Sequence, residues 1–237
     1  MTGTLINVAT VVVGTALGTF LGDRLPARIR ETVLHSLGLV TLVVGLGQAF
    51  ELFQRPLSTH RASVVVILGA ILLGGLIGEA LRIEAGLNRA GEALKRRFGK
   101  GQARFVEGFV VASLVFCVGP LTVLGSVQDG LFGDFDLLAI KSLLDGFAAM
   151  AFASALGWGV GFSVVTILVY QGGLTLGAAA VESAFTPITI AALTAAGGIL
   201  ILGIGLRLLE LKEIRVANLL PALVLAPVGM SLVERFA

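Results

Sequence analysis

The chain has 237 residues, of which 56% are hydrophobic and only 14% are charged. A soluble domain of this length carries nearer a quarter charged residues, so the composition excludes an ordinary soluble domain and indicates that the bilayer is the solvent. The longest polar stretch, residues 82–104, is too short to bury a core of its own. We therefore expect one integral membrane domain over residues 1–237. The formal net charge is only +2, and we expect no nucleic-acid partner.

Apolar runs long enough to cross a bilayer recur along the whole chain. A span needs about 20 mostly apolar residues, and the sequence offers about eight such runs, so we expect an all-α polytopic helical membrane bundle. The predicted spans are Thr4–Gly22, Thr32–Phe53, Ser63–Leu81, Phe105–Val127, Leu137–Leu156, Trp158–Val181, Thr186–Leu206 and Val216–Val233.

Charges in the connecting loops predict the orientation of these spans. The connections after the first, third and seventh spans hold thirteen of the seventeen Lys and Arg residues, and they fall on one side of the membrane. The positive-inside rule places these basic loops in the cytoplasm and both termini outside. A re-entrant fourth or sixth span would change this assignment.

The cytoplasmic segment 82–104 has the pattern of a basic amphipathic helix. Apolar residues recur at helical spacing from Ile83 to Phe98, with Arg and Lys on the opposite face. We expect this helix to lie on the inner leaflet and to end at Gly99-Lys100-Gly101. It serves as a topology anchor or, alternatively, as a lipid-sensing element.

Two spans share a glycine pattern that suggests an internal repeat. Small residues at every fourth position are followed by Gly, an acidic residue, any residue and Leu. The matching positions are Gly14, Gly18, Gly22, Asp23 and Leu25 in the first span, and Ala70, Gly74, Gly78, Glu79 and Leu81 in the third. Such repeats are common in transporters, although glycine-rich apolar helices also resemble one another by chance.

The fourth span contains Gly119-Pro120 near its middle, and this pair predicts an interrupted helix. Proline lacks the N–H that would bond the carbonyl one turn earlier, and in lipid that carbonyl needs another partner or a wet cavity. A binding site made of the Gly119 and Pro120 backbone, with Thr122 and Ser126 nearby, is one interpretation. A kink that neighbouring groups satisfy is the other.

A second interruption is expected in the sixth span. Gln171-Gly172-Gly173 resembles the fourth span's glycine motif in sequence. Gln171 would act as a ligand beside backbone groups freed at Gly172 and Gly173. The remaining amides in or near spans, Asn7, Gln48 and Asn218, are interhelical contacts or ligands.

Asp145 and Lys141 are the ionisable residues placed within an otherwise apolar span. Their i,i+4 spacing puts them on one helix face, where they can pair. An ionisable group in a span is costly and usually faces a bundle interior or water. Asp145 is therefore predicted to bind a cation or proton, with Lys141 as its partner in one state. The alternative is a static pair that fixes helix register.

Three further aspartates lie between the fourth and fifth spans. Asp129, Asp134 and Asp136 occur with Gly130 and Gly133, and we expect them in a solvated external turn. The segment lacks the ligand spacing of a calcium loop. With one cysteine, Cys117, a cysteine cluster is excluded. We expect neither a metal site nor a cofactor, and without a catalytic motif we do not expect an enzyme.

Several motifs together resemble a known family. They are ASLVFCVGPLTVLGSVQDGLFGD, KSLLDG, YQGGLTL, the opening GTLINVATVVVGTALG and the late NLLPAL. The chain resembles, over essentially its whole length, the YdfK/YqgA-like bacterial inner-membrane proteins catalogued as domain of unknown function 554. The resemblance implies an integral plasma-membrane protein of bacteria, suspected of transport and without an assigned substrate. It carries over no site residue.

These observations lead us to expect a secondary transporter of a small polar solute or cation across the bacterial inner membrane. The predicted site residues are Asp145, Lys141, Gln171, Gly119, Pro120, Gly172, Gly173, Thr122 and Ser126. Alternatives are a non-transporting scaffold or assembly protein and a passive channel. The lipid bilayer is the expected environment, and a homo-oligomer is expected because glycine faces can also pack between protomers.

Overall fold

A computed structural model describes residues 1–22, 24–98, 103–181 and 186–236, and all its regular elements are helices. The α-helices are α1 (Thr2–Gly22), α2 (Ala27–Ala49), α3 (Ser63–Leu81), α4 (Ile83–Phe98), α5 (Phe105–Val118), α6 (Pro120–Phe132), α7 (Asp136–Leu156), α8 (Ser163–Leu176), α9 (Ala178–Val181), α10 (Pro187–Leu208) and α11 (Ala222–Phe236). The 3₁₀ helices are η1 (Phe50–Phe53), η2 (Leu57–Thr59), η3 (Trp158–Phe162) and η5 (Val216–Leu219).

The predicted number of spans is confirmed. Within the described part of the chain, seven helical segments are long and apolar enough to cross a membrane, and the bent pair α5 and α6 brings the number to eight. In lipid every backbone N–H and C=O must be satisfied within the protein, which explains why apolar runs of this length form helices. The protein is an all-α membrane bundle.

The chain divides into two compact units. Unit 1 comprises Met1–Leu37 and Leu87–Val181, and unit 2 comprises Gly38–Gly86 and Glu182–Ala237. The helices α1, α5, α6, α7 and α8 belong to unit 1, whereas α3, α10 and α11 belong to unit 2. Each unit is described by itself below.

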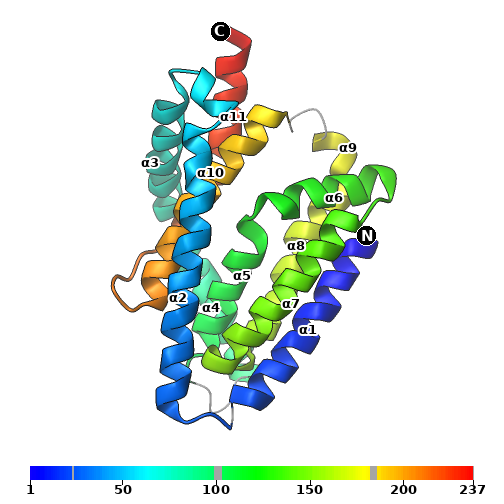
Figure 1. Ribbon diagram of the computed structural model, residues 1–237, viewed down its shortest axis with the longest axis vertical. Coiled ribbons are helices and arrows are strands. Elements are labelled where there is room, and N and C mark those ends of the chain that lie inside the picture. The colour runs from blue at the N-terminus through cyan, green and yellow to red at the C-terminus, as the bar shows by residue number, and fades with distance from the viewer. Residues whose placement is uncertain (23, 99–102, 182–185, 237) are drawn as a thin grey trace. The chain divides into compact units, whose positions relative to one another are not determined.

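Unit 1 is built around the close pairing of α1 with α7, which lie side by side (Figure 1). A Cβ atom at Gly14 would collide with the backbone carbonyl of Gly146, and one at Gly18 with the carbonyl of Met150. Gly22 meets Ser154 in the same way. Membrane helices associate through packing rather than a hydrophobic driving force, so small residues that allow close backbone approach stabilise the pair.

Unit 2 uses the related glycine pattern for the same purpose. Gly74 of α3 lies against the backbone of Ala222 at the start of α11, and Gly78 lies against the Asn218 carbonyl of η5. The two sequence-similar glycine faces thus both pack on backbone, each within its own unit. Whether they descend from one repeated unit stays a prediction.

The predicted break in the fourth span is present. Gly119 has an extended backbone (φ −74°, ψ 150°), and the axes of α5 and α6 differ by 63° (Figure 1). Pro120 cannot donate to the Phe116 carbonyl one turn earlier. The Thr122 hydroxyl donates to that carbonyl instead, at 3.1 Å. A neighbouring side chain therefore satisfies the group that proline leaves free.

The predicted break at Gly172-Gly173 is wrong in its position. α8 runs without interruption from Ser163 to Leu176. The departures from α-helical geometry in this span lie at its ends, in η3 and in the turn at Gly177 that follows Leu176. Glycine alone does not break a helix in lipid, because a broken helix would leave backbone groups without partners.

The amphipathic helix predicted from Ile83 to Phe98 is α4. Its expected end at Gly99-Lys100-Gly101 lies outside the described residues. The apolar side of α4 contacts protein: Gly91 lies against Val106 and Phe109 of α5, and Phe98 stacks on Phe162 at 5.2 Å between ring centroids. Packing on α5 and η3 thus covers part of the apolar face of α4, whereas Phe98 remains 44% exposed.

Candidate functional site

A buried ion pair lies in the middle of unit 1. Lys141 donates from Nζ to Oδ2 of Asp145 one turn later on α7. Only 6% of the Lys141 side chain and 12% of the Asp145 side chain are exposed. The pair that the i,i+4 spacing predicts is therefore formed, and it is almost completely withdrawn from the surface.

Two amides connect this ion pair to neighbouring helices. Asn7 of α1 donates from Nδ2 to Asp145 Oδ2 at 3.0 Å and to Gln171 Oε1 of α8 at 2.9 Å. Gln171 donates from Nε2 to the Thr4 hydroxyl of α1 at 3.2 Å. A single polar network thus joins α1, α7 and α8, and we call it the Asp145 network: Thr4, Asn7, Lys141, Asp145, Gln171 and Thr175.

The donors and acceptors of this network have a defined direction. The Thr175 hydroxyl donates to the Gln171 carbonyl at 3.0 Å, so its oxygen is free to accept from the Thr4 hydroxyl at 3.4 Å. An ionised carboxylate can only accept, which orients the Asn7 amide with Nδ2 toward Asp145. Asn7 Oδ1 is then left buried, with no hydrogen-bond partner among the described residues. An unpaired buried carbonyl oxygen is a ready acceptor for a cation or an N–H donor.

The break in the fourth span lies between two helices that pack on the network. Both α5 and α6 contact α7 and α8, the helices that carry Asp145 and Gln171. Gly119 and Pro120 lie at the junction of α5 and α6 and produce the bend between them. The sequence-predicted break and the sequence-predicted ion pair are therefore parts of one region.

Other predicted site residues have structural partners. Thr122 donates to the Phe116 carbonyl and Ser126 donates to the Thr122 carbonyl at 2.5 Å, so both hydroxyl protons are used within α5 and α6. Gly172 and Gly173 lie inside continuous α8 and do not supply unpaired backbone groups as predicted. Asn7 makes interhelical contacts, one of the two roles predicted for it. Thr4 and Thr175 were not predicted, because nothing in the sequence places them beside Asp145.

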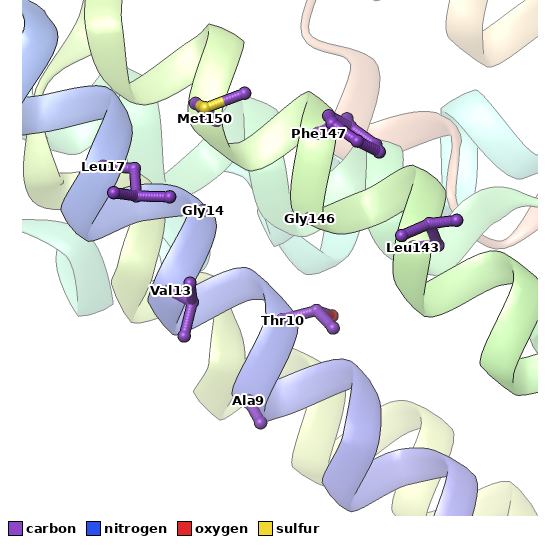
Figure 2. A pocket seen from close by; sticks show the side chains of 9 residues that line it. All are labelled: Ala9, Thr10, Val13, Gly14, Leu17, Leu143, Gly146, Phe147 and Met150. Carbon is purple, nitrogen blue, oxygen red and sulfur yellow. The ribbon is translucent and has the colours of Figure 1, made fainter.

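Among the described residues of unit 1, two surface grooves lie along α1. One has a volume of about 290 Å³ and lies between α1 and α7, where Ala9, Gly14, Gly146 and Phe147 are among its lining residues (Figure 2). The other, of about 580 Å³, lies between α1 and the η3–α8 segment. Neither groove is lined by Asp145 or Lys141, so in this conformation the ion pair lies behind the packed faces of the helices.

Asp129 corrects a prediction about the external turn. It is 5% exposed and lies on α6, where its carboxylate accepts from the Gly3 N–H at 3.1 Å and pairs with the Met1 amino group at 2.9 Å. Asp134 and Asp136 are exposed, as expected for a solvated turn. The interpretation holds for these two residues and is wrong for Asp129.

Unit 2 contains a second polar cluster at the junction of α3 and α4. Glu84 accepts from Arg207 and from the Ala217 N–H, each at 2.9 Å, and its own N–H donates to Asn218 Oδ1 at 2.7 Å. Glu79 accepts from Arg215 and from Asn218, each at 2.6 Å. Every charge in this cluster has a partner of opposite sign, which indicates that it fixes α3, α10 and η5 to one another.

Comparison with known proteins identifies the family. A family model described as "Protein of unknown function (DUF554)" matches residues 2–231. The chain belongs to the DUF554 family.

Two curated relatives extend over nearly the whole chain. The "Uncharacterized protein YqgA" of Escherichia coli K12 is 34% identical over 229 residues, covering 94% of each chain. The "Uncharacterized membrane protein YdfK" of Bacillus subtilis 168 is 30% identical over 236 residues, covering all of this chain and 98% of the relative. No solved structure matches. The name of the Bacillus subtilis relative describes it as a membrane protein, which agrees with the helices described above.

Proposed function

We propose that this protein is an ion-coupled transporter of a small polar solute or cation, located in the bacterial inner membrane with its basic loops in the cytoplasm. The observation that carries the proposal is the buried Lys141–Asp145 pair. A buried ion pair contributes little net stability, because desolvation of the two charges offsets their attraction. Charges inside membrane spans usually mark ion or proton pathways.

Asp145 would be the coupling residue. Binding of a proton or cation at its carboxylate neutralises the negative charge and removes the partner that holds Lys141. A buried, unpaired Lys141 is unstable, so the region must rearrange or expose the ammonium group to water. This gives two states that differ in the charge at Asp145, which is the requirement for coupling an ion to a conformational change.

The amides of Asn7 and Gln171 would change their hydrogen bonds when the charge at Asp145 changes, and they would also bind the solute. Both are held by the same hydrogen-bonded network, and Asn7 Oδ1 has an unused acceptor position. The bend at Gly119-Pro120 joins two helices that both pack on the helices of this network, and proline prevents a continuous helix there. Discontinuous helices at the binding site are typical of secondary transporters.

A second candidate function is a non-transporting membrane scaffold. It is favoured by one observation: the Phe116 carbonyl freed by Pro120 is bonded to Thr122, so the break is satisfied without a ligand. In this case the Asp145 network would act only to fix the packing of α1, α7 and α8.

Proton movement in proteoliposomes tests the transport proposal. Vesicles that contain the purified protein and a pH-sensitive dye are challenged with amino acids, small organic acids and monovalent cations in turn. Transport predicts that one class changes the internal pH or accumulates, and that Asp145→Asn abolishes this while the exposed Asp134→Asn does not. Equal fluxes in Asp145→Asn and the parent, or no flux above empty vesicles for every class, would favour the scaffold.

A further inference from the structure

The larger groove of unit 1 contains polar groups that nothing in the Asp145 network uses. It is formed by one face of α1 together with Trp158, Gly161 and Phe162. We call it the Trp158 groove. Its volume of about 580 Å³ falls within the ~300–1,000 Å³ range of small-molecule sites.

Two threonine hydroxyls in this groove lack partners. Thr15 is 5% exposed, and the Oγ1 atoms of Thr15 and Thr19 are buried without a hydrogen bond to any described residue. A Cβ atom at Gly161 would stand 3.1 Å from Thr15 Cγ2 and 3.5 Å from Thr15 Oγ1, so the Thr15 side chain borders the space that glycine leaves open. A buried hydroxyl without a partner is costly, which points to a ligand that supplies an acceptor.

A positive charge stands at one end of the groove. Phe20 lines the groove, and the guanidinium carbon of the exposed Arg24 lies 4.0 Å from the centroid of its ring. Thr15 and Thr19 are one turn apart, about 6 Å along the helix axis, and Arg24 lies beyond the end of α1 at Gly22. The two hydroxyls and then the cation therefore follow one another along α1, with apolar groove residues between them.

We propose that the Trp158 groove binds an anionic phospholipid of the surrounding bilayer. One acyl chain would lie against Val12, Ala16 and Phe162, its ester carbonyls would accept from Thr15 and Thr19, and its phosphate would face Arg24. The hydroxyls and the cation thus follow one another in the order of the ester and phosphate groups of a phospholipid molecule. The proposal does not depend on transport through the Asp145 network.

The single tryptophan of the chain makes the groove directly observable. The protein is reconstituted in phosphatidylcholine vesicles. One series contains increasing fractions of brominated phosphatidylglycerol and the other contains increasing fractions of brominated phosphatidylcholine, each lipid being brominated on one acyl chain. Bromine quenches Trp158 fluorescence on contact. One near-surface arginine predicts that phosphatidylglycerol reaches half-maximal quenching at about fivefold lower mole fraction.

Matched variants separate the groove from general lipid contact. Arg24→Gln should remove the preference for phosphatidylglycerol, whereas Arg28→Gln, which changes an exposed arginine in the first turn of α2, should retain it. Ala16→Phe fills the Trp158 groove and should reduce quenching by both lipids, whereas Ala9→Phe alters the α1–α7 groove and should not. Thr15→Val with Thr19→Val should weaken quenching by both lipids.

Three results would overturn the proposal. They are equal quenching by the two lipids in the parent, a preference that survives Arg24→Gln or is equally lost in Arg28→Gln, and quenching that Ala16→Phe leaves unchanged. The exposed positions of Arg24 and Ala16 allow both variants to fold, so the test holds even if the threonine variant does not.

Discussion

The Lys141 ammonium group is buried against the Asp145 carboxylate one helical turn later, and Asn7 donates to the same carboxylate oxygen from another helix. Two opposite charges in an apolar bundle are tolerable only together. The pair links a local feature of α7 to the packing of α1 and α8, and the proposed transport function depends on it.

Removing one charge should destabilise the protein more than removing both. Asp145→Leu or Lys141→Met leaves an uncompensated buried charge and should lower the free energy of unfolding by about 3 kcal/mol. The double variant should recover most of that loss. Unfolding in mixed micelles followed by circular dichroism gives the four values of the cycle. Additive effects would mean that the two side chains do not interact.

The hydroxyl of Thr122 should be required at the bend between α5 and α6. Thr122→Val keeps the shape but leaves the Phe116 carbonyl without its donor, which should cost about 2 kcal/mol. Thr122→Ser retains the hydroxyl and should remain closer to the parent. The same unfolding measurement applies, and a valine variant as stable as the serine variant would show that another group satisfies Phe116.

Close packing of α1 on α7 should be sensitive to a single methyl group. Gly14→Ala places a Cβ atom against the Gly146 carbonyl and should destabilise by about 2 kcal/mol. Gly173→Ala is the control, because a Cβ there meets nothing within 4 Å among the described residues. Since alanine favours a helix over glycine, this control should gain up to about 1 kcal/mol. Thermal unfolding in detergent should rank control, parent and Gly14→Ala in that order.

The two ion pairs of the unit 2 cluster should differ in how much they stabilise the folded protein. Glu84 is 7% exposed, and its carboxylate accepts hydrogen bonds from Arg207 and from the Ala217 N–H. Glu84→Gln should therefore lower the free energy of unfolding by about 3 kcal/mol. The Glu79–Arg215 pair is 57% and 69% exposed on its two side chains, and Arg215→Gln should cost less than about 1 kcal/mol. Comparable losses in both variants would contradict the assigned burial.

Local sequence signals predicted part of this site well. The i,i+4 spacing of Lys141 and Asp145 and the Gly119-Pro120 pair concern residues within one or two turns, where helix geometry determines the outcome. The eight spans followed from apolar length alone. The break predicted at Gly172-Gly173 is absent because glycine permits a break but does not require one. In lipid the intact helix keeps its backbone groups paired.

Contacts between residues far apart in the chain could not be predicted from the sequence. Asn7 and Asp145 are separated by 138 residues, and Gly3 and Asp129 by 126. Asp129 resembled its exposed neighbours Asp134 and Asp136 in composition, but its partners come from the start of α1. Only the packing of α1 among α6, α7 and α8 reveals these partners.

Ligand-dependent thermal stability of the purified protein tests the central claim most directly. The parent, Asp145→Asn and the exposed control Asp134→Asn are heated with monovalent and divalent cations, amino acids and small organic acids. A ligand of the folded state raises stability by about 2.7 kcal/mol at 100 times its dissociation constant. Transport through Asp145 predicts a shift for one ligand class in the parent and in Asp134→Asn that is absent in Asp145→Asn. A shift that persists in Asp145→Asn, or a flat panel with an unfolded Asp145→Asn, would contradict the claim and leave the ion pair as a static element of the bundle.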